Sequence, residues 1–254
     1  MTRIIAVSNQ KGGVGKTTTT LNLGGALAAA GSPTLLLDLD PQAALTAGLG
    51  RDPYALEANM WRVLADEIPM HDATLRINRH LYLVPGSGRL PGGPLEPDEP
   101  LEIGPHRLRR LLRRYRLPFH FVLIDTPPIL GGLTQSSLAA AGEVLVPVQC
   151  QFLAMRGVRG LFESLHRVRD ELNPDLGFTG VVATMFDPRS KLDGEVVEEL
   201  RRVLGKDRVR AVIERDGAIA EASVAGVPVT SLRPQSPAAL AYRALAEDQR
   251  NERL

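Results

Sequence analysis

Residues 4–18 read IIAVSNQKGGVGKTT, an apolar run followed by a glycine-rich turn and a Lys-Thr-Thr sequence. Four consecutive apolar residues at 4–7 are typical of a short strand buried on both faces, as in a parallel sheet. Residues 17–30 predict a helix, and Gly31 ends it. The stretch therefore predicts a strand, a tight loop and a helix in direct succession, the first unit of an α/β fold.

Short apolar runs alternate with longer amphipathic stretches along the rest of the chain. This alternation predicts an α/β fold, with a doubly wound, mostly parallel sheet flanked by helices. Further strands are predicted at residues 34–37, 81–84, 119–124, 143–148, 180–184 and 209–213. We expect a single domain over residues 1–254, with a surface loop near 86–105 where proline, glycine and acidic residues accumulate.

The composition is that of a globular protein with 254 residues, 44% hydrophobic and 23% charged residues, and a formal net charge of +1. This excludes a mostly disordered chain and a histone-like polycation, but it allows a local basic patch. The single cysteine, Cys150, excludes an intramolecular disulfide and a cysteine-rich metal centre, and favours the reducing cytoplasm. The N-terminus does not read as a signal peptide, and no run reaches the length of a membrane span.

The glycine-rich turn has the chemistry of a phosphate cradle. Glycines let successive backbone N–H groups point at an anion, and the following helix adds its positive N-terminal end. Lys16 is placed to reach the β- and γ-phosphates of a nucleotide, and the Thr17 hydroxyl to bind Mg²⁺. The predicted nucleotide-binding residues of this loop are Gly12, Gly13, Val14, Gly15, Lys16, Thr17 and Thr18.

The loop departs from the usual phosphate-loop spacing at its start. Gln10 stands where a glycine is usual, and a second lysine, Lys11, follows it. A cation at the mouth of a phosphate site can neutralise charge in a transition state, as an arginine finger does. Its position makes a reach into a neighbouring subunit's nucleotide plausible.

Carboxylates follow two of the predicted strands. Asp125 ends an apolar run, where ligands of open α/β sheets bind, and it can hold Mg²⁺. Asp38 and Asp40 are two residues apart in extended chain, so both are expected on one side, facing the γ-phosphate region. Like charges beside a triphosphate require a cation, which also favours Mg²⁺. The alternative for each aspartate is a helix-capping role.

These motifs together resemble the ParA/MinD family of ATPases, whose phosphate loop is the deviant Walker A type. The Lys11–Thr18 loop carries the likeness most strongly, while residues 36–42 look like the family's first switch and residues 123–128 like its Walker B and second switch. The likeness extends over nearly the whole chain, in the segments 146–149, 172–174 and 225–229, and is closest to ParA/Soj-type chromosome and plasmid partition ATPases. It implies a P-loop NTPase-like fold.

The resemblance also implies a function. It implies an ATP-dependent DNA-segregation ATPase that forms a sandwich homodimer with ATP, binds non-specific DNA and hydrolyses ATP slowly until a ParB-type partner stimulates it. ATP and Mg²⁺ are the implied cofactors, and the cytoplasm, at the nucleoid, is the implied location. Alternatives are a ParA-like ATPase that positions a protein cargo over the nucleoid, and a MinD-like or nucleotide-sensing scaffold.

The resemblance assigns roles to individual residues. Lys11 crosses the dimer, and Asp40 positions the attacking water, whereas Asp38 is an outer-shell Mg²⁺ or structural group. The implied catalytic residues are Lys11, Lys16 and Asp40; the implied metal-site residues are Thr17, Asp40 and Asp125; and the implied adenine contacts are Met185, Arg215 and Asp216.

Basic residues in the C-terminal half are the expected DNA contacts, although solvated surface charges are the alternative. The candidates are Arg189, Lys191, Arg202, Arg215 and Arg233. The segments 214–216 and 233–237 depart from the usual family pattern, which leaves the DNA-contacting residues open.

Two helices are predicted outside these motifs. The arginines of residues 107–116 surround a leucine stripe at helical spacing, which favours a solvated helix face and leaves a DNA or partner role open. Residues 238–254 predict a helix packed on the sheet, not a membrane-binding one, so no membrane partner is expected.

Overall fold

The computed structural model describes residues 2–115, 118–151 and 154–252. Its strands form one sheet in the order β3-β4-β2-β5-β1-β6-β7-β8, parallel throughout except for the β3–β4 pair. The strands are β1 (Arg3–Val7), β2 (Thr34–Asp38), β3 (Leu75–Arg76), β4 (Leu81–Val84), β5 (Phe121–Asp125), β6 (Glu143–Gln149), β7 (Gly177–Phe186) and β8 (Val209–Glu214). The predicted α/β fold with a mostly parallel sheet is confirmed.

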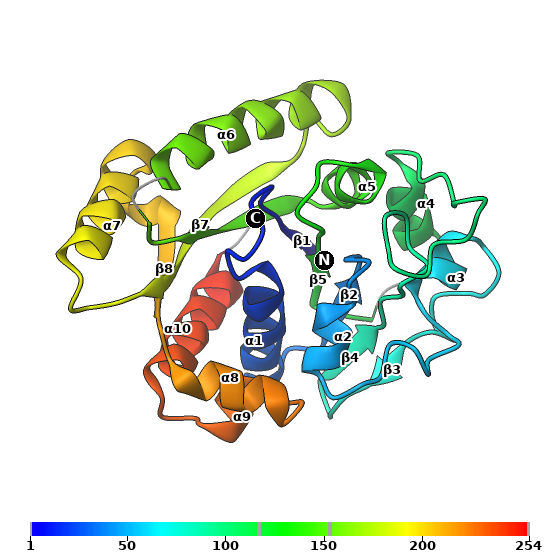
Figure 1. The fold of residues 1–254 in the computed structure, drawn as a ribbon, viewed down its shortest axis with the longest axis horizontal. Coiled ribbons are helices and arrows are strands. Elements are labelled where there is room, and N and C mark those ends of the chain that lie inside the picture. The colour runs from blue at the N-terminus through cyan, green and yellow to red at the C-terminus, as the bar shows by residue number, and fades with distance from the viewer. Residues whose placement is uncertain (1, 116–117, 152–153, 253–254) are drawn as a thin grey trace.

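Helices cover both faces of this sheet (Figure 1). On one face lie α1 (Lys16–Ala29), α2 (Ala44–Gly48), α8 (Gly217–Val224), α9 (Val229–Leu232) and α10 (Pro237–Asn251). On the other lie α3 (Met60–Leu64), α4 (Arg107–Arg114), α5 (Gly132–Ala140), α6 (Ala154–Glu171) and α7 (Lys191–Leu204). A short 3₁₀ helix, η1 (Lys206–Arg208), precedes β8.

The central strands are apolar on both sides because each side packs against a helix layer. Ile5 and Leu36 pack in the cluster that includes α1 and α10, whereas Ala6 and Leu35 face the opposite layer. All four side chains are fully buried. Burial on both faces explains why the sequence of these strands is continuously apolar rather than alternating.

The structure adds one strand that the sequence did not predict, the antiparallel edge strand β3. It has two residues, too few for a periodic signal. The strand predicted at 180–184 is longer in the structure, and a register shift between Val144 and Leu145 accompanies it.

The C-terminal helix packs against α1 and β8, as Figure 1 shows. Tyr242, Leu245 and Ala246 are buried, but Leu240, which the sequence placed on the same apolar face, is 48% exposed. Residues 253–254 of the predicted helix lie outside the described residues. Among the helices in the described ranges, none is long and apolar enough to cross a membrane.

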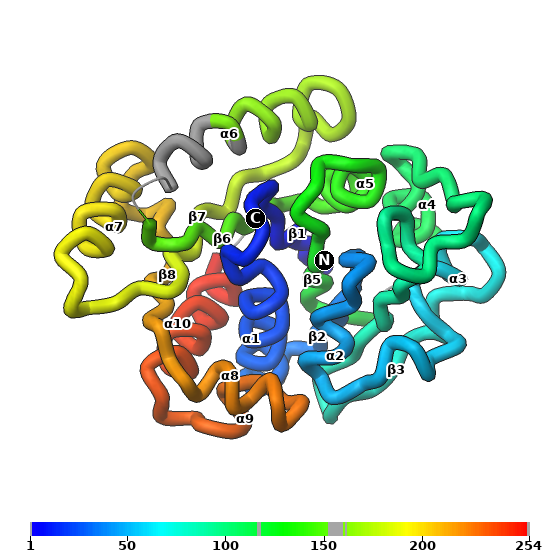
Figure 2. The backbone as a smooth tube through the Cα atoms, viewed as in Figure 1, coloured from blue at the N-terminus to red at the C-terminus, as the bar shows by residue number. Residues whose placement is uncertain are grey.

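The proline- and glycine-rich loop between β4 and α4 folds back beside α4 at one edge of the molecule (Figure 2). Its beginning is packed, since Ser87 and Leu90 are buried, whereas residues 91–100 are all exposed or partly exposed. The buried part brings Gly86 next to the end of β2.

Candidate nucleotide site

The phosphate loop lies at the carboxyl edge of the sheet, between β1 and α1. Asp125 is the register partner of both Val7 and Asp38, so β5 brings its carboxylate directly between the first two strands. Gly13 and Gly15 adopt φ of 71° and 87°, the left-handed region that favours glycine. Gly15 caps α1 without a side-chain hydrogen bond, which leaves the N–H groups of the first turn available to an anion.

A hydrogen bond joins the predicted metal residues. Thr17 Oγ1 donates to Asp125 Oδ2 at 2.7 Å, and Thr20 Oγ1 lies 3.4 Å from Asp125 Oδ1. Thr20 also donates to the Lys16 carbonyl oxygen at 3.1 Å. The two hydroxyls hold the carboxylate against the first turn of α1.

The loop lysine is enclosed by this arrangement. Lys16 is 6% exposed, and its Nζ donates to the Lys11 carbonyl oxygen at 3.2 Å. Burial lowers the pKa of Lys16, and the charges of Asp125 and Asp40 partly restore it. A buried ammonium with a single hydrogen-bond acceptor among the described residues is well placed to bind an added anion.

The end of β2 carries two aspartates with different surroundings. Asp38 Oδ2 accepts hydrogen bonds from the backbone N–H and the hydroxyl of Thr46, at 2.9 and 2.6 Å, and the same hydroxyl accepts one from Gly86 at 2.8 Å. Burial raises the pKa of Asp38 to about 6. Asp40, 9% exposed, accepts a hydrogen bond from the Gln42 N–H at 2.9 Å. The two carboxylates therefore have different roles. Asp38 connects β2 to α2 directly and, through the Thr46 hydroxyl, to the loop that follows β4.

The clustered carboxylates favour the binding of a cation between them. Burial and the charges of Asp38 and Asp40 raise the pKa of Asp125 well above its ordinary value. Over the part of the chain that the structure describes, no three His, Cys, Asp or Glu side chains converge as a metal-holding group. A metal here would need oxygens from phosphate and water as well, which is the way Mg²⁺ is usually bound. Thr17 and Asp125 fit such a metal.

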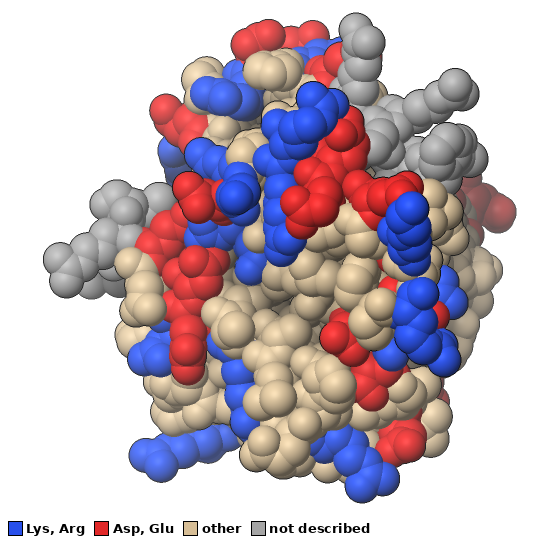
Figure 3. Space-filling view, turned by 90° about the vertical axis from the view of Figure 1, so that its left-hand side faces the viewer, with Lys and Arg blue, Asp and Glu red and all other residues tan. Residues whose placement is uncertain are grey.

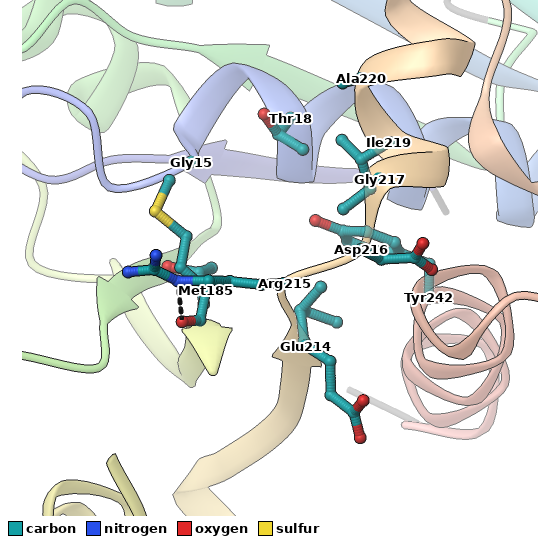
Figure 4. A pocket seen from close by; sticks show the side chains of 12 residues that line it. Gly15, Thr18, Met185, Glu214, Arg215, Asp216, Gly217, Ile219, Ala220 and Tyr242 are labelled. Carbon is teal, nitrogen blue, oxygen red and sulfur yellow. Dashed lines mark hydrogen bonds between the residues drawn. The ribbon is translucent and has the colours of Figure 1, made fainter. Parts of the chain in front are cut away.

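Beyond Gly15 the loop opens into a cavity of about 410 Å³, a volume suited to a small organic ligand. Thr18 of α1, Ile219 of α8, and Met185 and Arg215 from the ends of β7 and β8 line it (Figure 4). Arg215 Nε donates to the Met185 carbonyl oxygen at 3.1 Å. The mostly apolar walls beside the phosphate loop suit a nucleoside base.

Asp216 also lines this cavity, but its carboxylate is engaged in capping. It accepts hydrogen bonds from Ala218 and Ala238, at the starts of α8 and α10. Burial opposes ionisation of Asp216, yet these backbone N–H groups hold its pKa below the ordinary value. Its side chain therefore shapes the pocket by fixing two helix ends.

The extra lysine points out of its own loop. Lys11 is exposed, and its Nζ lies 3.3 Å from Gln151 Oε1. Gln10 donates to Ser164 Oγ of α6 at 2.6 Å. Gln151 and Ser164, like Thr20 and Thr46, were missed by sequence reasoning. No motif marks them, and contacts such as Lys11 with Gln151 span 140 residues.

The predicted DNA contacts are mostly engaged with neighbouring carboxylates. The pairs are Arg189 with Asp187, Lys191 with Glu195, Arg202 with Glu199, and Arg233 with Glu221. Arg215, the remaining candidate, lines the cavity. Figure 3 shows the result on the side of the molecule that carries α7, where basic and acidic side chains interleave.

The fold and the loop together define a P-loop nucleotide-binding α/β protein. Residues 2–178 match the family described as AAA domain. The chromosome partitioning protein ParA of Caulobacter vibrioides is 39% identical over 249 residues, which are 97% of this chain and 93% of that protein. The sporulation initiation inhibitor protein Soj of Bacillus subtilis is 37% identical over 251 residues, 98% of each chain.

A solved structure shows the same arrangement of the chain. Cobyrinic acid a,c-diamide synthase from Mycobacterium smegmatis, with a bound ATP analog and magnesium, has a TM-score of 0.81 and 35% identity, covering 97% of this chain and 93% of that one. The resemblance read from the motifs is confirmed: the chain belongs to the ParA/Soj family and is a ParA-family ATPase.

Proposed function

We propose that this chain is a DNA-partition ATPase. Two ATP-bound copies form a sandwich dimer that binds DNA without sequence preference, and hydrolysis, stimulated by a ParB-type partner, releases the DNA. The named relatives from Caulobacter vibrioides and Bacillus subtilis support this role, since the first is named a chromosome partitioning protein. The nucleoid, in the cytoplasm, is the proposed place of action.

The observation that carries the proposal is the convergence of Lys16, Thr17 and Asp125 under the phosphate loop. Lys16 would bind the β- and γ-phosphates of ATP, and Thr17 and Asp125 would hold Mg²⁺. The metal would supply positive charge that screens the phosphates from the buried carboxylates. Asp40 would orient the attacking water.

The base would occupy the cavity beside Thr18, Met185 and Arg215. The walls of this cavity come from four segments that are far apart in the sequence, the last of them Tyr242 of α10. Base binding would therefore couple α1 to the C-terminal helices. Asp216 would contribute by holding the ends of α8 and α10 in place.

The position of the Lys11 side chain supports a role for the dimer in ATP hydrolysis. Its side chain contacts Gln151 outside its own loop, whereas Lys16 occupies the loop interior. A cation so placed is free to stabilise charge on a neighbouring subunit's nucleotide. In this proposal each copy completes the active site of the other.

Co-sedimentation of random-sequence DNA with ATP, with ADP and without nucleotide tests the proposal. We expect binding with ATP alone, lost in Lys16→Ala and kept in Asp40→Ala, because the first cannot hold the phosphates and the second holds ATP without hydrolysing it. Sedimentation velocity should show the dimer under the same conditions. A wild-type protein that binds no DNA in any nucleotide state would refute the partition role.

A further inference from the structure

The exposed side of α4 is a cluster of arginines without partners. The helix sequence is RLRRLLRR, with no acidic residue. Arg109, Arg110 and Arg113 make no ion pair and no side-chain hydrogen bond with any residue in the described ranges, and Arg110 and Arg113 are exposed. Arg113 follows Arg110 by three residues and Arg109 by four, so it is a neighbour of both on the helix surface.

The rest of the helix anchors the backbone that carries this cluster. Leu108, Leu111 and Leu112 are buried in the core cluster under β2 and β5. The Leu108 N–H donates to Ser136 Oγ of α5 at 2.9 Å, which fixes the first turn. The cluster therefore sits on a fixed support rather than on a mobile loop.

Two of the five helix arginines share one carboxylate. Asp66 lies 2.8 Å from Arg107 and 3.4 Å from Arg114, and Arg107 also contacts the Leu64 carbonyl oxygen. The Asp66 carboxylate is thus shared between Arg107 and Arg114. The dipole of the helix favours a cation at Arg113, in the last turn, but gives no such support to Arg109 and Arg110 nearer its start.

Like charges at this spacing destabilise a helix unless an anion lies between them. The candidate contacts in the C-terminal half present the opposite case, because Arg189, Arg202 and Arg233 are each held by a carboxylate. The three α4 guanidinium groups thus have no carboxylate partner in the described ranges, whereas these three C-terminal candidates do.

We propose that Arg109, Arg110 and Arg113 of α4 contact the phosphate backbone of DNA. Phosphate is the anion that guanidinium groups bind bidentately, and backbone contacts need no apolar anchor. A protein partner would be expected to use exposed apolar or aromatic anchors, but all three leucines of α4 point into the core. The inference rests on the proposed DNA-binding function and moves its contacts to a different face.

A salt series of DNA affinity tests the assignment, using the full-length protein with ATP and Mg²⁺ and a random-sequence duplex. Replacing Arg109, Arg110 and Arg113 together by Gln should lower the slope of log affinity against log salt by about 0.9 for each lost phosphate contact. The matched control replaces Arg189, Arg202 and Arg233 by Gln, with the same change in charge, and should keep the wild-type slope.

A second variant separates charge from folding. Replacing the same three α4 arginines by Lys retains the charge and should retain most of the wild-type slope. Circular dichroism and binding of a fluorescent ATP analog check that each variant is folded. If the triple Gln variant loses its fold as well as DNA binding, the Lys variant and a single Arg110→Gln variant test the assignment instead. The Arg110→Gln change is expected to lower the slope by about 0.9.

The outcomes distinguish this inference from the proposed function. Wild-type protein that fails to bind DNA with ATP refutes the proposed function itself. Wild-type binding with an unchanged slope in the α4 Gln variant, or an equal loss in the matched control, overturns the α4 assignment alone. Loss of binding to phosphatidylglycerol vesicles, with DNA binding intact, would assign the cluster to an anionic membrane instead and would equally overturn it.

Discussion

Thr17 Oγ1 and Asp125 Oδ2 lie 2.7 Å apart, and this hydrogen bond joins the first turn of α1 to the last residue of β5. It spans 108 residues and brings the phosphate loop and the second switch segment into one unit. The Leu39 N–H donates to the Asp125 carbonyl oxygen at 3.1 Å, which adds the first switch segment to the same unit. Changes at Asp125 should therefore affect metal and nucleotide together.

We expect Asp125→Asn to weaken Mg²⁺-dependent ATP binding by roughly 10- to 100-fold, the range for losing a hydrogen-bonded group around a metal. The amide keeps an acceptor for Thr17 but removes the charge that attracts the metal. Calorimetric titration of ATP with and without Mg²⁺ measures the effect. The exposed Asp52→Asn serves as control, and an unaltered Mg²⁺ dependence in Asp125→Asn would contradict the assignment.

Lys11→Ala should leave ATP affinity unchanged, because its side chain contacts Gln151 rather than the interior of its own loop. Partner-stimulated turnover should fall by roughly 10³-fold, the lower end of the range for a charge-stabilising finger residue. Equilibrium ATP binding and phosphate release separate the two effects. Lys191→Ala, also an exposed lysine, should change neither, and a Lys11→Ala protein with normal turnover would exclude a role in trans.

Thr46→Val should destabilise the protein by roughly 2–4 kcal/mol, since it strips a hydrogen bond from the buried Asp38 carboxylate and leaves the Gly86 N–H without its acceptor. Thr46→Ser keeps the hydroxyl and should recover most of the loss. Urea unfolding measures both free energies. Equal stability of the Val and Ser variants would show that the hydroxyl contributes little.

Arg3 and Glu143 form a buried ion pair, with exposed side-chain fractions of 8% and 9% and two short contacts. Arg3→Met should cost about 3–5 kcal/mol because the Glu143 carboxylate stays buried without a cation. Glu143→Leu should cost less, because Glu252, 3.3 Å from Arg3, still pairs with that guanidinium. The double variant should be much closer to wild type. Chemical denaturation of the four proteins gives the coupling energy, and strict additivity would contradict the prediction.

Cys150 should be inert in the folded protein. Burial, with a smaller contribution from Asp193, raises the pKa of its thiol from 9.0 to about 12. Since the folded pKa is the higher one, this group's contribution to stability is present below pH 9 and is lost as the pH rises towards 12. A thiol-reactive dye at pH 8 should label Cys150 only in denaturant, whereas rapid labelling of the native protein would refute this environment.

Local sequence determined the phosphate loop and the parallel sheet. The order of glycines and lysines in residues 11–18 dictates which backbone N–H groups can turn inward, and apolar runs such as 34–37 dictate burial on both faces. Both are short-range properties, so they could be predicted without knowing which segments meet. The α4 helix was predictable for the same reason, from the spacing of its leucines.

Only the tertiary structure decided which charges are free. Asp38 and Asp40 look alike in the sequence, but packing gives Asp38 the hydroxyl of Thr46. Likewise Arg233 is paired with Glu221 of α8, 12 residues away along the chain, whereas Arg110 has no partner in the described chain. A charge is neutralised by the groups that the folded chain brings within a few ångströms of it. Which groups these are depends on the rotamer of the side chain and on neighbours that are distant in the sequence. The sequence determined the chemistry of the site, and tertiary packing determined which of its charged groups remain available to a ligand.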